Sequence, residues 1–316
     1  MTSRIFGVGV DIGGTFAKII AVSPQGRVLS FMQVPTFEDR GPRPFVRRVA
    51  DAVGGLERTL GARAHALGIG AAGDLDWARG RLRFAPNLPH FEGFPLRDAF
   101  SRALSRPCVI ENDANMAAWG AYVVELKRKA SNMLAVTLGT GVGGGMVLGG
   151  RLYPGATGTA GEFGHMCIRP GGALCSCGLR GCLEAYAGRK GLIREARRLL
   201  ALRRSRSILR DAGAELDPIH ICRAARKGDP LALGIWRDMG AALGQGIANL
   251  VLCFNPDAVV LVGGVSRAGR FFLPALKKEL RRNPFRVPFS HVRVQVGTTE
   301  NLGALGAGLL ALEKRR

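Results

Sequence analysis

The chain has 316 residues, of which 47% are apolar and 22% charged, a composition that suits a folded protein of about two domains. It carries 45 basic and 24 acidic residues, a net charge of +21, with basic clusters in residues 189–210 and 277–286. A polyanion partner is one interpretation of this charge. We favour a solvated basic surface and expect no nucleic-acid partner, because no aromatic residues are interleaved for stacking and no nucleic-acid module is recognisable.

Neither membrane insertion nor export is indicated by the sequence. The most apolar helix candidate, residues 231–254, is interrupted by Arg237, Asp238, Gln245 and Asn249, so we expect no membrane span. The first residues lead into a strand-like segment without an apolar signal core. An odd number of cysteines, seven, does not favour a disulfide framework. These features predict a cytoplasmic protein.

The first third of the chain begins as a meander of strands. Residues 5–10, 16–22 and 27–34 are predicted strands, joined by the turns DIGGT and SPQG. A helical pattern follows at about residues 44–60, and then a buried strand at about 67–71.

A similar arrangement recurs near residue 133. A predicted strand at 133–138, the glycine-rich turn GTGVGGG and strands at 146–148 and 151–153 repeat the order strand, glycine turn, strand. Helices predominate from residue 184, apart from a strand at 258–262, and the last helix is predicted at 302–314. This weak internal repeat predicts two related α/β halves that face a cleft.

The first glycine turn has the composition of a phosphate site. Gly13 and Gly14 allow backbone N–H groups to approach phosphate oxygens, Thr15 adds a hydroxyl group, and Lys18 could add charge. Asp11, at the end of a strand, is placed to hold Mg²⁺ through water. A plain β-hairpin with a glycine turn is the alternative.

The second glycine turn, which contains Gly139, Thr140 and Gly141, matches the pattern G-x-G-x-x-G. A dinucleotide site needs a helix after these glycines, whereas here a strand is expected. The sequence has no Walker A motif either. We therefore predict a phosphate-binding turn outside the Rossmann and P-loop classes.

The segment Glu111-Asn112-Asp113-Ala114-Asn115 lies between a predicted strand at 108–110 and a helix that begins near residue 116. Its Asn and Asp side chains could cap that helix. Alternatively, a carboxylate at this strand-to-helix corner could accept a proton from a sugar hydroxyl.

A metal site is predicted from His165, Cys175, Cys177 and Cys182, whose spacing is H-x9-C-x-C-x4-C. Three thiolates and one imidazole form a closed structural zinc set. Three unrelated buried cysteines or a redox role are the alternatives, but the chain lacks C-x-x-C here. Glu184 follows closely, so a zinc ion would fix its position.

Together these motifs resemble the ROK family of repressors and sugar kinases, whose fold is like that of actin and hexokinase. The resemblance covers nearly the whole chain and rests on DIGGTFAK, ENDAN, TLGTGVGGG, GEFGHM with CSCGLRGCLE, and VLVGGVS. It implies a two-domain actin-like (ribonuclease H-like) α/β fold with a cleft and a zinc knuckle. The smaller domain would comprise residues 1–113 and 303–316. The larger would comprise 114–302, with the zinc loop at 161–184.

The resemblance also implies roles for individual residues. Asp113 would be the catalytic base of an ATP-dependent hexokinase that uses Mg²⁺ and holds a structural Zn²⁺. The sugar ligands would be Gly73, Asn87, Asn112, Asp113, Glu162, His165 and Glu184. The nucleotide site would comprise Asp11, Gly13, Gly14, Thr15, Lys18, Gly139, Thr140, Gly141, Gly263 and Gly264. A homodimer is implied as well.

Some positions on the sugar side differ from the family pattern. Ala72 and Asp74 stand where prolines are usual, and His90-Phe91 where Gly-Trp is common. ENDAN resembles the catalytic motif of the glucokinase-like branch of the family, and this resemblance implies glucose as the sugar in preference to fructose or N-acetylmannosamine. Three alternatives stay open: a sugar-sensing protein without catalysis, a polyanion-binding protein on a kinase fold, and a kinase that uses polyphosphate.

Overall fold

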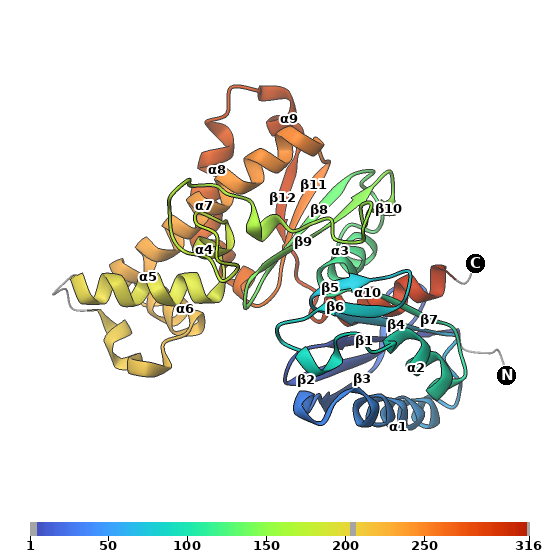
Figure 1. Ribbon diagram of the computed structural model, residues 1–316. Helices are drawn as coiled ribbons and strands as arrows, with labels where there is room; N and C mark the ends of the chain where they lie inside the picture. The colour runs from blue at the N-terminus through green and yellow to red at the C-terminus, as the bar shows by residue number, and fades with distance from the viewer. Residues whose placement is uncertain (1–4, 203–206, 315–316) are drawn as a thin grey trace. The chain divides into compact units, whose positions relative to one another are not determined.

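The computed structural model describes residues 5–202 and 207–314, and it contains two five-stranded sheets and one two-stranded sheet (Figure 1). Part of the basic stretch predicted from the sequence, residues 203–206, lies outside the described residues. No helix in the described ranges is long and apolar enough to cross a membrane.

The first sheet has the strand order β3-β2-β1-β4-β7. Strands β1, β2 and β3 are antiparallel, whereas β1, β4 and β7 are parallel. Because parallel strands end at the same edge of a sheet, the segments that follow β1, β4 and β7 lie together. The strands are β1 Gly7–Ile12, β2 Phe16–Val22, β3 Val28–Pro35, β4 Ala66–Ala71 and β7 Cys108–Asn112.

The second sheet repeats this topology, with the order β10-β9-β8-β11-β12. In each sheet the first strand lies between the second and the fourth, so the internal repeat predicted from the sequence is confirmed. Strands β8, β11 and β12 are parallel. The strands are β8 Met133–Leu138, β9 Val142–Leu148, β10 Arg151–Leu152, β11 Ala258–Val262 and β12 Arg293–Val296.

Helix α10 packs against α3, β1 and β4 and completes the core of the first sheet. The approach is close because small residues face each other. A Cβ atom added at Gly9 would lie 1.8 Å from the carbonyl oxygen of Ala304, and one added at Gly68 would lie 1.9 Å from that of Ala307. The helices here are α1 Pro42–Leu60, α2 Leu96–Leu104, α3 Asp113–Val124 and α10 Leu302–Glu313.

The remaining helices are joined mainly through the long helix α7, which packs along α8. The pair buries Trp236 and Phe272, whose ring centroids are 6.3 Å apart. These helices are α4 Glu184–Ala187, α5 Arg189–Leu202, α6 Pro218–Arg226, α7 Pro230–Phe254, α8 Gly269–Arg281 and α9 Arg286–His291.

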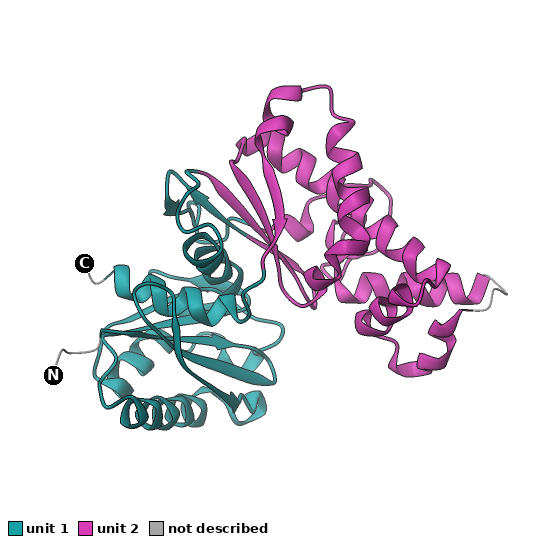
Figure 2. Ribbon diagram, turned by 180° about the vertical axis from the view of Figure 1, so that it is seen from behind, with its two compact units in different colours: residues 1–131, 145–161, 298–316 teal, residues 132–144, 162–297 magenta. Residues whose placement is uncertain are grey.

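The chain divides into two compact units (Figure 2). The first comprises residues 1–131, 145–161 and 298–316, and the second comprises residues 132–144 and 162–297. This division places α3 in the first unit, whereas the sequence analysis put the boundary after residue 113. The boundary after residue 113 stays a prediction of how the chain divides into folding domains.

Some element boundaries differ from those predicted. The turn after β8 is shorter than expected, because β9 begins at Val142 and includes three of the glycines. Helix α3 begins at Asp113 and not near Met116, since Asn112 already caps it. The short strands β5 Asp74–Asp76, β6 Arg81–Phe84 and β12 were not predicted.

Candidate active site and metal centre

The turn after β1 is fixed by its own hydrogen bonds. The N–H of Gly13 donates to the carbonyl of Phe16 at 3.1 Å, and the hydroxyl of Thr36 donates to the carbonyl of Gly13 at 2.7 Å. The N–H of Gly13 therefore shapes the turn. Gly14 and Thr15 are exposed, and a Cβ atom added at Gly14 would lie 3.2 Å from the carbonyl oxygen of Asn87. The structure thus brings Asn87 to the first glycine turn.

Asp11 lies near the end of β1, where Lys18 is its register partner on β2. Its carboxylate contacts the first turn of α10, because a Cβ atom added at Gly303 would lie 2.8 Å from Oδ2. Burial raises the pKa of Asp11, and the charge of Lys18 acts in the opposite direction. A cation at this carboxylate would offset the cost of burying its charge.

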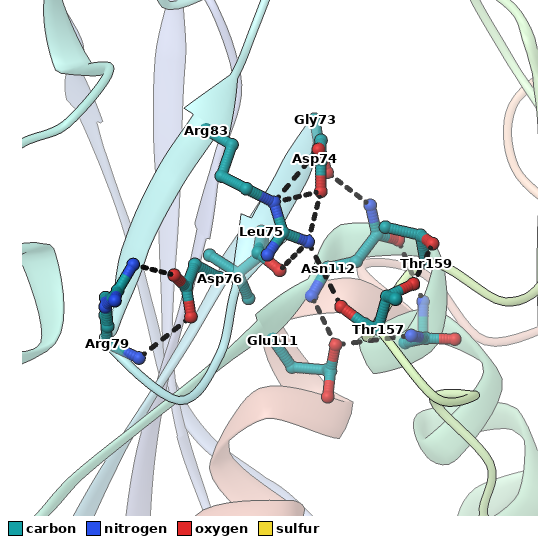
Figure 3. A network of polar contacts seen from close by, with 11 residues as sticks. Gly73, Asp74, Leu75, Asp76, Arg79, Arg83, Glu111, Asn112, Thr157 and Thr159 are labelled. Carbon is teal, nitrogen blue, oxygen red and sulfur yellow. Dashed lines mark hydrogen bonds and ion pairs between the residues drawn. The ribbon is translucent and has the colours of Figure 1, made fainter.

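Asn112 caps α3 and also anchors the segment after β4 (Figure 3). Its Oδ1 accepts the N–H groups of Ala114 at 2.9 Å and Asn115 at 3.3 Å. Its Nδ2 donates to the carbonyl of Gly73 at 3.2 Å. The capping interpretation is therefore confirmed for Asn112, and Gly73 and Asn112 are brought together.

Asp113 is the first residue of α3, and its side chain is half-buried. One carboxylate oxygen, Oδ1, accepts the N–H of Ala114 at 2.9 Å. A carboxylate in the first turn of a helix interacts favourably with the helix dipole. Since Asn112 already caps the helix, Asp113 is not required for that purpose.

The hairpin of β5 and β6 supports this corner through an ion pair that the sequence analysis missed (Figure 3). Asp74 accepts hydrogen bonds from Nε of Arg83 at 3.0 Å and from Nη2 at 2.7 Å. Nη2 also donates to the carbonyl of Thr157 at 3.1 Å. Asp74, where the family usually has proline, is thus linked through Arg83 to Thr157. The chain also differs from the family pattern at His90-Phe91. Phe91 is a core residue, because it is fully buried and packs against Phe45.

In the second unit, the glycines predicted to bind nucleotide lie at the ends of two neighbouring parallel strands. The N–H of Gly139 donates to the carbonyl of Gly141 at 3.0 Å, which closes a tight turn after β8. Gly263 follows β11 with a φ of 97°, and a Cβ atom added there would lie 2.4 Å from the carbonyl oxygen of Leu138. Thr140 and Gly264 are exposed. The backbone of both turns is therefore accessible at the same sheet edge.

The four predicted metal ligands form a cluster in the second unit. The ligand atoms of His165, Cys175, Cys177 and Cys182 all lie within 4.8 Å of one another. The Sγ atoms of Cys177 and Cys182 are 3.8 Å apart, and Sγ of Cys175 is 3.7 Å from Nδ1 of His165. Tetrahedral zinc with Zn–S bonds of about 2.3 Å requires S–S distances of roughly 3.8 Å. The donor set and its spacing therefore fit a closed zinc site.

Glu184, the first residue of α4, joins the cysteine loop to the glycine turn. Its Oε2 accepts the N–H of Val142 at 3.0 Å. Its Oε1 accepts the hydroxyl of Ser176 at 2.5 Å and the thiol of Cys175 at 3.6 Å. Glu162 is exposed, at the residue before the short turn Phe163–His165.

The predicted site residues fall into two groups, one in each unit. Those of the first unit lie at one edge of the first sheet or beside it: Asp11, Gly13, Gly14, Thr15, Lys18, Gly73, Asn87, Asn112 and Asp113. Those of the second unit lie at the end of β8, at the end of β11 or in the cysteine loop and α4: Gly139, Thr140, Gly141, Glu162, His165, Glu184, Gly263 and Gly264.

Comparison with known proteins identifies relatives over nearly the whole chain. The ROK family pattern matches residues 7–314. A glucokinase from Streptomyces coelicolor is 36% identical over 315 residues, which cover 97% of each chain. The crystal structure of a ROK hexokinase from Thermus thermophilus has a TM-score of 0.81 at 34% identity and covers 98% of this chain and 99% of that chain. A ROK glucokinase from Streptomyces griseus, solved in complex with glucose and AMPPNP, has a TM-score of 0.80 at 35% identity, with the same coverage.

The chain therefore belongs to the ROK family. Its repeated sheets have the actin-like α/β fold of the sugar kinases in that family, as the sequence analysis predicted. Within the family it is an ATP-dependent sugar kinase.

Proposed function

We propose that this enzyme is a glucokinase that transfers the γ-phosphoryl group of ATP to the 6-hydroxyl of glucose, with Asp113 as the general base. The observation that carries the proposal is the arrangement of the Asn112 and Asp113 side chains at the start of α3. Asn112 caps the helix, so the half-buried carboxylate of Asp113 is not needed as the cap, and its position at this strand-to-helix corner supports a role as base. The similarity to glucokinases over nearly the full chain supports glucose as the sugar.

In this mechanism the protein acts mainly by positioning the reactants. Asp113 would accept the proton of the 6-hydroxyl as that oxygen attacks phosphorus. Phosphoryl transfer passes through a loose transition state, so orientation and charge stabilisation supply most of the rate acceleration. Asn112 and Gly73, which are hydrogen-bonded to each other, would orient the sugar, together with Asn87.

The donor would be held by backbone groups of the glycine turns. Gly14 and Thr15 in the first unit and Gly139 to Gly141 in the second present exposed or half-exposed backbone at strand ends. Gly263 and Gly264 would contact the rest of the nucleotide. When bound, Mg²⁺ would neutralise phosphate charge, and Asp11 is the residue that we propose to hold it, through water.

We assign a structural Zn²⁺ to His165, Cys175, Cys177 and Cys182. With four protein ligands the ion has no open position, so it would hold the loop and activate no water. The loop carries His165 and precedes Glu184, which with Glu162 are the proposed sugar ligands of the second unit.

A basic cavity in the second unit supports inorganic polyphosphate as an alternative phosphoryl donor. A cavity of about 510 Å³ is lined by four basic side chains of α5, namely Arg189, Lys190, Arg194 and Arg197, and by one acidic side chain, Glu215. The N–H of Arg189 donates to the carbonyl of Gly139, so this cavity adjoins the glycine turn. Such a lining suits inorganic polyphosphate, which we keep as an alternative to ATP.

The decisive experiment is a panel of sugars with ATP and Mg²⁺, assayed in parallel with polyphosphate as donor. We expect the highest kcat/KM for glucose with ATP. Preference for fructose or N-acetylmannosamine would overturn the choice of sugar. Absence of turnover with every sugar, despite measurable glucose binding, would indicate a sugar-sensing protein. A cytoplasmic homodimer is part of the proposal, and light scattering of the purified protein tests the dimer.

A further inference from the structure

A second cavity lies within the first unit, behind the ENDAN segment. It has a volume of about 300 Å³, and its walls come from β7, α3, the loop after α3, β10 and α10. Glu111 lines it, and that residue directly precedes Asn112 and Asp113. None of the proposed sugar, nucleotide or zinc ligands lines this cavity.

Three basic side chains from separate segments line the cavity, namely Arg128, Arg151 and Lys314. Arg128 is paired with Glu313 and stacks over the ring of Trp119, with its Cζ atom 5.2 Å from the ring centroid. Arg151 and Lys314 form no ion pair with any other described residue. Two cationic groups at the cavity are therefore not neutralised by a direct ion pair.

Trp119 also lines the cavity. The residue is 3% exposed, and its indole Nε1 has no hydrogen-bond partner in the described part of the chain. That nitrogen is buried, so Trp119 contributes its ring to the cavity wall. The remaining wall is apolar, with Leu152, Pro154 and Leu310.

Glu111 lines the cavity and is also hydrogen-bonded to the proposed catalytic segment, as its contact with Asn112 in Figure 3 shows. The residue is 3% exposed, and its Oε1 accepts the N–H of Asn112 at 2.9 Å and Nδ2 of Asn115 at 3.2 Å. Burial raises the pKa of Glu111, while these two hydrogen bonds and the charge of Lys314 act in the opposite direction. A change in charge at Lys314 therefore reaches the residue that holds the backbone beside Asp113.

We propose that this cavity binds the phosphate group of a small phosphate monoester, and that the bound anion lowers turnover through Glu111. Phosphate oxygens would accept hydrogen bonds from Arg151 and Lys314, and the apolar wall with the Trp119 ring would cover the body of the ligand. An anion that engages Lys314 weakens its attraction to the Glu111 carboxylate, which favours the protonated form and loosens the hydrogen bonds to Asn112 and Asn115. The effect on turnover rests on the proposed role of Asp113, whereas the binding does not.

Binding is tested by titrating the protein with a hexose 6-phosphate and, separately, with inorganic phosphate, while tryptophan fluorescence and thermal stability are recorded. We expect saturable binding that is weakened at least about tenfold in the double variant Arg151→Gln/Lys314→Gln, because charge-assisted hydrogen bonds are lost. The exposed Arg47→Gln on α1 is the matched control and should bind as wild type does. Trp119→Phe should remove most of the fluorescence response, whereas Trp77→Phe should retain it.

Unchanged affinity in the double variant, or a full fluorescence response in Trp119→Phe, would place the anion elsewhere and overturn the site. For the second half of the proposal, kcat is measured with and without inorganic phosphate. We expect inhibition that higher glucose concentration does not relieve, and that is absent from the double variant. Binding at the cavity with unchanged kcat would overturn the link through Glu111 and leave the proposed glucokinase activity untouched.

Discussion

The carboxylate of Glu184 accepts the backbone N–H of Val142 at 3.0 Å, and this bond ties α4 to the glycine turn that precedes β9. The other carboxylate oxygen accepts a hydrogen bond from the hydroxyl of Ser176 in the cysteine loop. One side chain thus joins the proposed zinc loop to the proposed phosphate turn. Its loss should affect both substrates, although the family resemblance implies a role in sugar binding alone.

We therefore expect Glu184→Ala to raise the KM for glucose and the KM for ATP together. Each KM should rise roughly tenfold if the lost hydrogen bonds contribute about one to two kcal/mol to the binding free energy. Glu184→Gln keeps one acceptor oxygen and should have a smaller effect on ATP. Steady-state kinetics with each substrate varied provide the measurement. A change confined to the sugar would show that Glu184 acts only as a sugar ligand.

Asp113→Asn should lower kcat by roughly 10²–10⁴-fold, since it removes a general base. The helix should remain, because Asn112 provides its cap. Glucose affinity, measured by calorimetry, and the Tm should change little. Asp98→Asn is a matched control, because Asp98 occupies the first turn of α2. If the kcat of Asp113→Asn were as close to the wild-type value as the kcat of Asp98→Asn, Asp113 would be ruled out as the base.

Gly264→Ala tests the nucleotide site more cleanly than a change at Gly141. A Cβ atom added at Gly141 would lie 2.1 Å from Oε2 of Glu184, so that variant would also disturb Glu184. At Gly264, no atom lies within 4 Å of an added Cβ, and the φ of −63° suits alanine. We expect an unchanged Tm, an unchanged glucose KM and a raised ATP KM. Gly234→Ala on α7, where the nearest atom to an added Cβ is 3.9 Å away, is the control. An unaltered ATP KM would remove Gly264 from the nucleotide site.

The stability of the first unit should depend on pH through Glu57. This residue pairs with Arg106, and the two side chains are 13% and 7% exposed. Burial alone would raise the pKa of Glu57, but hydrogen bonds from Arg106 and from the N–H of Ala64, at 2.7 Å, hold it below its usual value. Glu57→Gln should therefore cost about 3 kcal/mol at pH 7, since it leaves Arg106 without its partner.

Because the pKa of Glu57 is lower in the folded chain than in the unfolded chain, the stabilisation is present above the unfolded pKa and is lost as the pH falls through the folded pKa. The difference in free energy of unfolding between wild type and Glu57→Gln should thus shrink below pH 4.5, the ordinary pKa of a glutamate. Urea unfolding across this range provides the measurement. Glu195→Gln, which removes an exposed pair with Arg198, should change stability little. If the difference in free energy of unfolding between wild type and Glu57→Gln stayed constant down to pH 3, this would contradict a stabilising role of the ionised Glu57 carboxylate.

Much of the fold could be predicted because apolar runs bounded by glycine turns determine strands locally. Strands β2, β8 and β11 have the predicted bounds, and the repeated order of strand, turn and strand predicted the duplicated topology. Strands β5, β6 and β12 were missed because each has only three or four residues, too few for their alternation to stand out as a strand pattern. Strand β12 pairs with β11, which is distant in sequence, and β5 and β6 pair with each other.

The site was predictable where its residues are close in sequence. The spacing of His165, Cys175, Cys177 and Cys182 indicated a cluster, and their ligand atoms are within 4.8 Å of one another. By contrast, no local pattern places Glu184 beside Val142, which is 42 residues away. The pair of Asp74 and Arg83 likewise depends on how the hairpin folds. Such contacts follow from tertiary packing, which a single sequence does not reveal.

Zinc removal should weaken glucose binding before it affects ATP binding. The four ligands hold a loop that carries His165 and ends at Glu184, and a closed site gives the ion a structural role. Cys177→Ala should therefore lose the metal, lower the Tm and raise the glucose KM, with a smaller change in the ATP KM. Elemental analysis of protein purified without a histidine tag should find one zinc per chain in wild type and little in the variant. Protons compete with the zinc ion for the thiolate ligands, and chelators compete with the thiolates for the ion, so acid and chelators should have the same effect as the substitution.

Cys253→Ala separates loss of the metal from loss of a thiol. Cys253 is exposed near the end of α7 and is not part of the cluster, so this variant should keep its zinc, its Tm and its kinetics. If Cys177→Ala lost zinc but kept the glucose KM, the loop would be held by its hydrogen bonds alone, including that from Ser176 to Glu184. Fully active wild-type protein with a zinc content near zero would defeat the metal assignment itself, because the thiols would then pack as a small buried cluster without an ion.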